Sequence, residues 1–176
     1  MGAITLDLRP SIEIRPFSLG MPICEAYKPN IYDVVHVKYF DEESLNLDIV
    51  ISFPDHGFYL RFNSWFQRLY LIEIFDVKRL EMCYSISLIG GQSTLATFSV
   101  VYASLGPTYP GNFYKDRGIY TLFNLGLSFA FSIPSQFTNC CHDGTTPITS
   151  CVSIYDSSFG KKVGMGSLMN EASAPP

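Results

Sequence analysis

Long apolar runs are missing from this sequence, and their absence limits what the chain can be. No stretch approaches the roughly 20 consecutive apolar residues that a membrane-spanning helix needs. The first residues include the acidic Asp7 and Glu13 and lack an apolar core of signal-peptide length. We therefore expect no transmembrane segment, no secretion and a cytoplasmic location.

Positive charge is scarce as well. The chain has 12 lysines and arginines against 16 acidic residues, which gives a formal net charge of −4. The basic residues are scattered, and their densest groups are the pairs Lys78-Arg79 and Lys161-Lys162. A nucleic-acid-binding protein needs a basic patch that neutralises phosphates, so we expect no nucleic-acid partner.

Cysteine occurs five times at irregular spacing, an odd count that argues for reduced thiols instead of a disulfide framework. The most suggestive group is Cys140-Cys141-His142 with Cys151, as a zinc site or as a thiol enzyme with Cys141 and His142. Zinc sites usually place roughly two to four residues between their cysteines, whereas adjacent cysteines of an extended segment point apart. Plain loop thiols are the favoured interpretation, so we expect no metal, no cofactor and no catalytic residue; zinc and thiol chemistry remain alternatives.

Aromatic and β-branched side chains are abundant. Hydrophobic residues make up 47% of the 176 residues and aromatic ones 15%, with 14 Phe and 11 Tyr, which favours a packed, sheet-rich protein. The centre of the chain predicts three consecutive antiparallel strands over Asp48–Phe53, Phe58–Phe62 and Leu69–Phe75. Apolar residues alternate along the second strand, so one face of this meander lies in a core. Glu73 stands among apolar residues of the third strand, and we expect its face to be only partly buried.

The turns of this meander hold two candidate sites. Asp55-His56-Gly57 has the composition of a hairpin turn, with an acid–base pair as the alternative. The next turn carries Trp65 and Phe66, close in sequence to Arg61 and Arg68. Exposed aromatic residues beside cations suit a membrane interface or a partner surface, and the alternative is simple packing across the hairpin end.

The remaining elements follow from periodicity and from the residues that cap or break structure. The first is an edge strand over Ile4–Arg9, stopped by Pro10, and a stunted helix over Ile23–Lys28 follows, capped by Ser18 or Gly20 and ended by Pro29. Two further strands are expected over Ile31–Phe40 and over Lys78–Ser87, the latter broken at Gly90-Gly91. A helix over Ser93–Leu105, capped by Ser93 or Thr94 and ended at Gly106-Pro107, precedes a loop over Thr108–Gly118.

A second hairpin over Ile119–Phe123 and Leu127–Ile133 has a pattern close to that of the central hairpin. An internal repeat explains this likeness, as does coincidence between two Phe-rich hairpins. We expect one α+β domain over residues 1–134, mostly antiparallel sheet, with two hairpin modules at about 1–89 and 90–134. Residues 135–176 are expected to be a loop, a short strand at Cys151–Tyr155 and a loosely ordered tail.

An ordered set of motifs resembles the phagosome assembly factor family over about residues 6–155. The set consists of Leu19-Gly20-Met21-Pro22, Asp48-Ile49-Val50-Ile51, Gly57-Phe58-Tyr59-Leu60-Arg61-Phe62, Gln67-Arg68-Leu69, Ile72-Glu73-Ile74-Phe75-Asp76, Gly106-Pro107-Thr108-Tyr109-Pro110-Gly111 and Gly126-Leu127-Ser128-Phe129.

The resemblance implies a non-enzymatic autophagy factor, a scaffold or adaptor recruited to the phagophore. It implies a β-propeller autophagy protein as partner and a phosphoinositide membrane that the complex recognises. An older association with Golgi trafficking supplies an alternative function. No catalytic residues come with the family.

Two departures from the family pattern carry expectations of their own. A full helix usually follows the Leu-Gly-Met-Pro motif, whereas here Pro29 follows Ala26 almost at once. Compared with the family pattern, residues are also absent between Gly144 and Thr145, and family members continue beyond the point where this sequence stops. We expect a shortened form that covers the amino-terminal half of the family protein.

Overall fold

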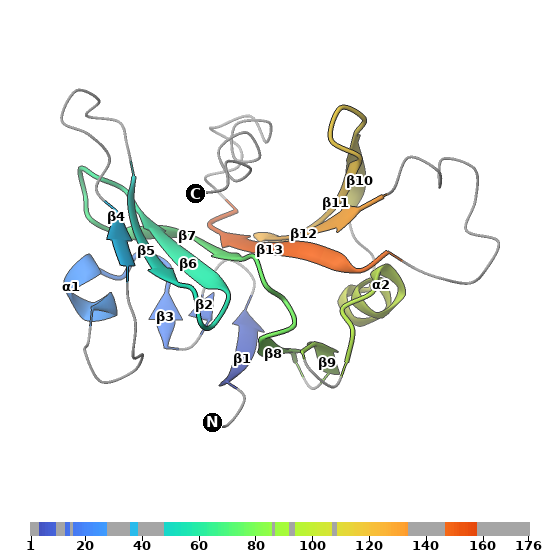
Figure 1. Cartoon of the computed structure of the whole chain (residues 1–176), viewed down its shortest axis with the longest axis horizontal. Helices are drawn as coiled ribbons and strands as arrows, with labels where there is room; N and C mark the ends of the chain where they lie inside the picture. Colours follow the sequence, from blue (N-terminus) through green and yellow to red (C-terminus); the bar gives the residue numbers. More distant parts are fainter. Residues whose placement is uncertain are drawn as a thin grey trace.

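The computed structural model describes residues 4–9, 13–14, 16–27, 36–38, 48–85, 87–91, 94–106, 109–133 and 147–157. Strands dominate this part of the chain, and the two helices that accompany them are short, which confirms the expected α+β class (Figure 1). The elements in chain order are β1 (Ile4–Arg9), β2 (Glu13–Ile14), β3 (Phe17–Ser18), α1 (Ile23–Ala26), β4 (His36–Lys38), β5 (Ile49–Phe53), β6 (Phe58–Phe62), β7 (Leu69–Ile74), β8 (Leu80–Tyr84), β9 (Ser87–Gly90), α2 (Phe98–Leu105), β10 (Tyr109–Tyr114), β11 (Ile119–Asn124), β12 (Leu127–Ser132) and β13 (Thr149–Tyr155).

The larger sheet has the strand order β10-β11-β12-β13-β7-β6-β5-β4, and each neighbouring pair is antiparallel. It consists of two four-stranded meanders, β4–β7 and β10–β13, which meet where β13 pairs with β7. Both predicted hairpins are confirmed here. The short strand predicted at Cys151–Tyr155 is confirmed as part of β13, which lies in the middle of the sheet.

The smaller sheet has the order β3-β2-β1-β8-β9. Its β1 and β8 run parallel, with Ile4 opposite Leu80 and Asp7 opposite Cys83. Parallel neighbours need a long crossover, and here the crossover contains the whole first meander. The amino-terminal strand is therefore tied to the segment that follows β7, and its predicted edge position is wrong, because β2 and β8 flank it.

The core lies between the two sheets. Apolar residues from one face of the large sheet pack against the small sheet and both helices, which lie on the same side of that sheet in Figure 1. Phe17 of β3 contacts Phe53 and Phe58 with ring centroids 5.7 Å away in each case, and those two rings stack at 4.6 Å. Fully burying one such side chain stabilises a fold by about 1.5–3 kcal/mol, so this cluster holds the sheets together.

β10 contradicts the loop predicted over Thr108–Gly118. Pro110 and Gly111 suggested a turn, but the backbone of Tyr109–Tyr114 pairs with β11 at the edge of the large sheet. An edge strand tolerates proline because one side of its backbone has no strand partner. The pairing register shifts between Tyr109 and Asn112, which absorbs the irregular segment.

α2 begins later than predicted. Thr97, and not Ser93 or Thr94, is the N-cap, and its Oγ1 accepts from the Val100 N–H at 3.4 Å. The preceding residues are extended because they bind the start of β13: Thr149 N–H donates to the Ala96 carbonyl at 2.8 Å. The predicted end at Gly106 is confirmed, with φ +70° at that glycine.

Two further local predictions are wrong. The single strand expected over Lys78–Ser87 is a hairpin, β8 and β9, that turns at Ser85 with φ +57°, and Gly90 belongs to β9. The residue before α1 is Pro22, so neither Ser18 nor Gly20 caps this helix. The stunted helix itself is confirmed over Ile23–Ala26.

Of the strand predicted over Ile31–Phe40, the structure describes the part in β4. The division of the chain at residue 134 into two modules and a tail stays a prediction. β13 comes from beyond that boundary and completes the second meander.

Candidate functional site

The turn between β6 and β7 carries the aromatic residues singled out in the sequence, and Asn63 organises it. The Asn63 Oδ1 accepts from the Trp65 and Phe66 N–H groups, each at 3.0 Å. The Asn63 carbonyl accepts from the Gln67 N–H at 2.8 Å, and the Asn63 N–H donates to the Arg68 carbonyl at 3.0 Å. The turn is thus closed by its own hydrogen bonds.

The side chains of Trp65 and Phe66 point outward from this turn. Their exposed fractions, 68% and 78%, are the highest among the large apolar side chains that the structure describes. Packing across the hairpin end, the alternative to an interaction surface, would bury them. We call Trp65, Phe66 and Arg68 the aromatic turn.

A strap formed by Gly20, Met21 and Ile23 holds the aromatic turn from the other side. Gly20 N–H donates to the Leu69 carbonyl at 2.7 Å, Leu69 N–H donates to the Met21 carbonyl at 3.0 Å, and Ile23 N–H donates to the Gln67 carbonyl at 3.0 Å. Gly20 has φ +85°, a conformation that favours glycine. The Leu-Gly-Met-Pro motif therefore has a structural role that sequence reasoning missed: it fixes the turn against the start of α1.

Arg68 joins the strap and stays exposed. Its Nη1 donates to the Gly20 carbonyl at 3.1 Å. α1 lies at the same end of the molecule as the turn (Figure 1), and its Glu25 and its C-cap residue Tyr27 are exposed too. Tyr27, which directly follows α1 and is 58% exposed, is an aromatic residue that the sequence pattern did not single out.

Arg61, the fourth residue of the predicted surface, does not join the aromatic turn. Its Nε donates to Glu73 Oε2 at 2.9 Å, and its Nη1 lies 3.6 Å from Asp48 Oδ2. Tyr70 donates its hydroxyl proton to the same Asp48 carboxylate, and the guanidinium lies over the Tyr59 ring, 5.4 Å from its centroid. Arg61 is thus the centre of a polar cluster on the sheet face opposite the core.

Glu73 corrects the expectation of a partly buried face. Its side chain is 2% exposed because Arg61 from the neighbouring strand neutralises it, so β7 is buried on both faces. Burial raises the pKa of Glu73, and the attraction of Arg61 offsets only part of that effect. Burial also raises the pKa of the Tyr59 hydroxyl, and the negative Glu73 adds to the rise.

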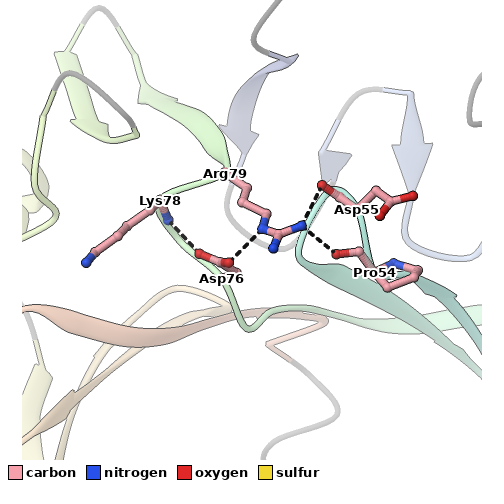
Figure 2. Close-up of polar contacts among 5 residues, drawn as sticks. All are labelled: Pro54, Asp55, Asp76, Lys78 and Arg79. Carbon is pink, nitrogen blue, oxygen red and sulfur yellow. Dashed lines mark hydrogen bonds and ion pairs between the residues drawn. The ribbon is translucent and has the colours of Figure 1, made fainter. Parts of the chain in front are cut away.

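The Asp55-His56-Gly57 segment forms the predicted turn, and Arg79 fastens it. Figure 2 shows the Arg79 guanidinium donating to Asp76 Oδ2 at 2.8 Å and to the carbonyls of Pro54 and Asp55, each at 3.2 Å. At Gly57, with φ +76°, an added Cβ would lie 2.6 Å from the Asp76 Cβ. This arrangement ties the β5–β6 turn to the β7–β8 connection.

The cysteine group cannot be assembled from the described residues. Cys140, Cys141 and His142 lie outside them, and Cys151 lies in β13, where burial raises the pKa of its thiol to about 12. Within the described ranges, no three His, Cys, Asp or Glu residues come together in a way that could hold a metal ion. No helix in the same ranges is both long and apolar enough to cross a membrane.

Comparison with known proteins bears on what this architecture is used for. The family model for phagosome assembly factor 1 matches residues 13–174. A PHAF1 protein of Arabidopsis thaliana is 63% identical over 192 residues, which cover 100% of this chain and 47% of the relative. The chain spans less than half the length of the curated relatives it matches.

More distant relatives agree. A PHAF1 protein of Drosophila melanogaster is 28% identical over 170 residues, covering 86% of this chain and 39% of the relative. One of Caenorhabditis elegans is 28% identical over 128 residues, covering 70% of this chain and 30% of the relative. No solved structure matches the chain. On the family match over nearly its whole length, this chain belongs to the phagosome assembly factor 1 family.

Proposed function

We propose that this chain acts as a non-enzymatic autophagy factor, a scaffold or adaptor that is recruited to the phagophore. The partners we propose are a β-propeller autophagy protein and phosphoinositide-containing membrane, with the chain in the cytoplasm and at the membrane periphery. The observation that carries this proposal is the match of residues 13–174 to the phagosome assembly factor 1 family.

The aromatic turn is the surface that we propose for this recruitment. A scaffold without catalytic residues acts through exposed side chains, and Trp65 and Phe66 are the most exposed large apolar ones described. Arg68 adds a cation beside them. Arg61, with its ion pair to Glu73, supports the hairpin that presents these residues.

Imaging of the tagged chain in starved cells tests the proposal. We expect puncta that overlap autophagosomal markers and that require the β-propeller partner. The double variant Trp65→Ser/Phe66→Ser is expected to be as abundant as the parent but diffuse. Leu125→Ser is the matched control, because Leu125 is also an exposed apolar residue of a hairpin turn, with 57% of its side chain exposed.

Two outcomes would count against the proposal. Diffuse distribution of the stable parent chain after starvation would contradict phagophore recruitment. Overlap with Golgi markers in place of autophagosomal ones would support the alternative function, a trafficking adaptor.

A further inference from the structure

We propose that the aromatic turn itself inserts into the interface of an anionic phospholipid membrane, with Trp65 and Phe66 in the interface and Arg68 at the level of the phosphates. This inference rests on the proposed function and deepens it. Recruitment to a membrane can run through a partner alone, whereas here the chain makes its own lipid contact.

The exposed area at the turn is the first argument. Trp65 and Phe66 are adjacent in sequence and are exposed by 68% and 78%, whereas the next most exposed large apolar side chains among the described residues reach 58% and 57%. Two neighbouring aromatic rings kept in water are unfavourable, so a binding partner or a membrane is expected to cover them. Tryptophan favours the boundary between headgroups and acyl chains, because its ring is apolar while its N–H can remain hydrated.

The hydrogen bonds of the turn's backbone favour a lipid membrane over a protein partner as the surface that covers Trp65 and Phe66. The N–H groups of Trp65 and Phe66 both donate to the Asn63 side chain, and the Gln67 N–H donates to the Asn63 carbonyl. The acyl chains that the two rings would contact provide no replacement for lost water hydrogen bonds, so a backbone that enters with the rings must satisfy its donors internally. A protein partner imposes no such requirement, because it can supply acceptors of its own.

The turn is also preorganised. The strap formed by Gly20, Met21 and Ile23 fixes it through hydrogen bonds of 2.7–3.0 Å to residues on both sides of Arg68. Insertion therefore does not require a flexible loop to become ordered, so no entropy cost of ordering reduces the binding free energy of the rings.

The charges around the turn define which lipids it favours. Arg68 uses Nη1 for the Gly20 carbonyl, and a guanidinium has further N–H donors that suit phosphate oxygens. Glu25 of α1 is exposed at the same end of the molecule as the aromatic turn, and its negative charge repels anionic lipid (Figure 1). Opposite effects are therefore expected when these two charges are removed one at a time.

The test uses the fact that Trp65 is the one tryptophan of the chain, so its fluorescence reports on the proposed site alone. The purified 176-residue chain is titrated with vesicles of phosphatidylcholine, with or without phosphatidylserine. We expect a blue shift of the emission and protection from iodide quenching with the anionic vesicles. Emission that does not change while the chain sediments with vesicles would place the lipid contact elsewhere and overturn the inference.

Variants sharpen the test while keeping Trp65. Phe66→Ala is expected to weaken vesicle affinity about tenfold through lost apolar contact. Arg68→Gln is expected to weaken it about fivefold on anionic vesicles only, and Glu25→Gln to strengthen it there. Leu125→Ala is the control, with unchanged affinity expected. Equal losses in Phe66→Ala and Leu125→Ala would refute a contact specific to the aromatic turn.

The vesicle result can be separated from the imaging result. One possible result is that Trp65 emission does not change with vesicles but shifts on addition of the β-propeller protein, while puncta still form in starved cells. The turn is then a protein-binding surface. The direct lipid contact is then wrong while the proposed function stands. If neither puncta nor vesicle binding occurs, both are wrong.

Discussion

Replacing Arg61 by methionine is the perturbation for which the structure gives the most definite expectation. Methionine keeps most of the side-chain volume but leaves Glu73 without the cation that lies 2.9 Å from its carboxylate. Breaking a buried ion pair by removing one partner destabilises a protein by about 3–5 kcal/mol. Arg61 is 14% exposed and some water can reach the pair, so we expect the lower end, about 3 kcal/mol.

The loss should depend on pH, and its sign follows from Glu73. Burial raises the pKa of this carboxyl in the folded chain, so the folded state holds its proton to higher pH than the unfolded state. Stability therefore falls as pH rises from the usual pKa of Glu, about 4.3, through the raised one. Without Arg61 the folded pKa rises further, so the variant loses less stability at pH 5 than at pH 8.

Urea unfolding followed by far-ultraviolet circular dichroism measures both effects, since Trp65 is too exposed for its fluorescence to report on the core. Adding Glu73→Gln to Arg61→Met removes the uncompensated charge and should restore most of the stability at pH 8. An equal loss at pH 5 and pH 8, with no recovery in the double variant, would refute the reasoning. Such a result would mean that Arg61 acts through packing of its aliphatic stem.

The remaining predictions concern other contacts. Arg79→Met should lower the urea-derived stability by about 1 kcal/mol, because its hydrogen bonds lie at a half-exposed site; no change would mean that solvent replaces them. Gly57→Ala should lower it by at least about 2 kcal/mol, through positive φ and the clash with Asp76; a neutral result would contradict the close approach. Iodoacetamide should modify the exposed Cys24 in the native chain much faster than the half-buried Cys151, because burial raises the pKa of the Cys151 thiol to about 12; equal native-state rates, measured by mass spectrometry, would contradict this reasoning.

Local patterns in the sequence predicted the parts of the fold that depend on local structure. The alternation of Phe58, Leu60 and Phe62 located β6 and its core face, and Gly106 located the end of α2. Tertiary pairing decided the parts that were missed. The segment around Pro110 has a turn composition and is a strand because β11 lies beside it. The start of α2 shifted to Thr97 because the residues before it pair with the segment leading into β13.

The candidate site was predictable only where it depends on local sequence. Two aromatic residues in a six-residue turn suggested Trp65 and Phe66, and both are exposed. Arg61 was grouped with them by closeness in sequence, although a strand residue points away from the hairpin end. Its partner Glu73 lies on the adjacent strand β7. Tyr59 of β6 is directly opposite Glu73, and Arg61 is the next residue of β6 on the same face as Tyr59. Matching opposite charges on the non-core faces of two consecutive strands is the signal that would have found the pair.

The pairing of β7 with β13 has a consequence for synthesis of the chain. About 75 residues separate the end of β7 from the start of β13, so at roughly 5–20 residues per second β7 leaves the ribosome about 4–15 s earlier. During that interval the first meander ends in an unpaired strand with apolar residues on both sides, an edge to which other nascent chains can add. We therefore expect slower translation of residues 75–148 to lengthen the exposure of this edge and to lower the fraction of newly made chain that reaches the eight-stranded sheet.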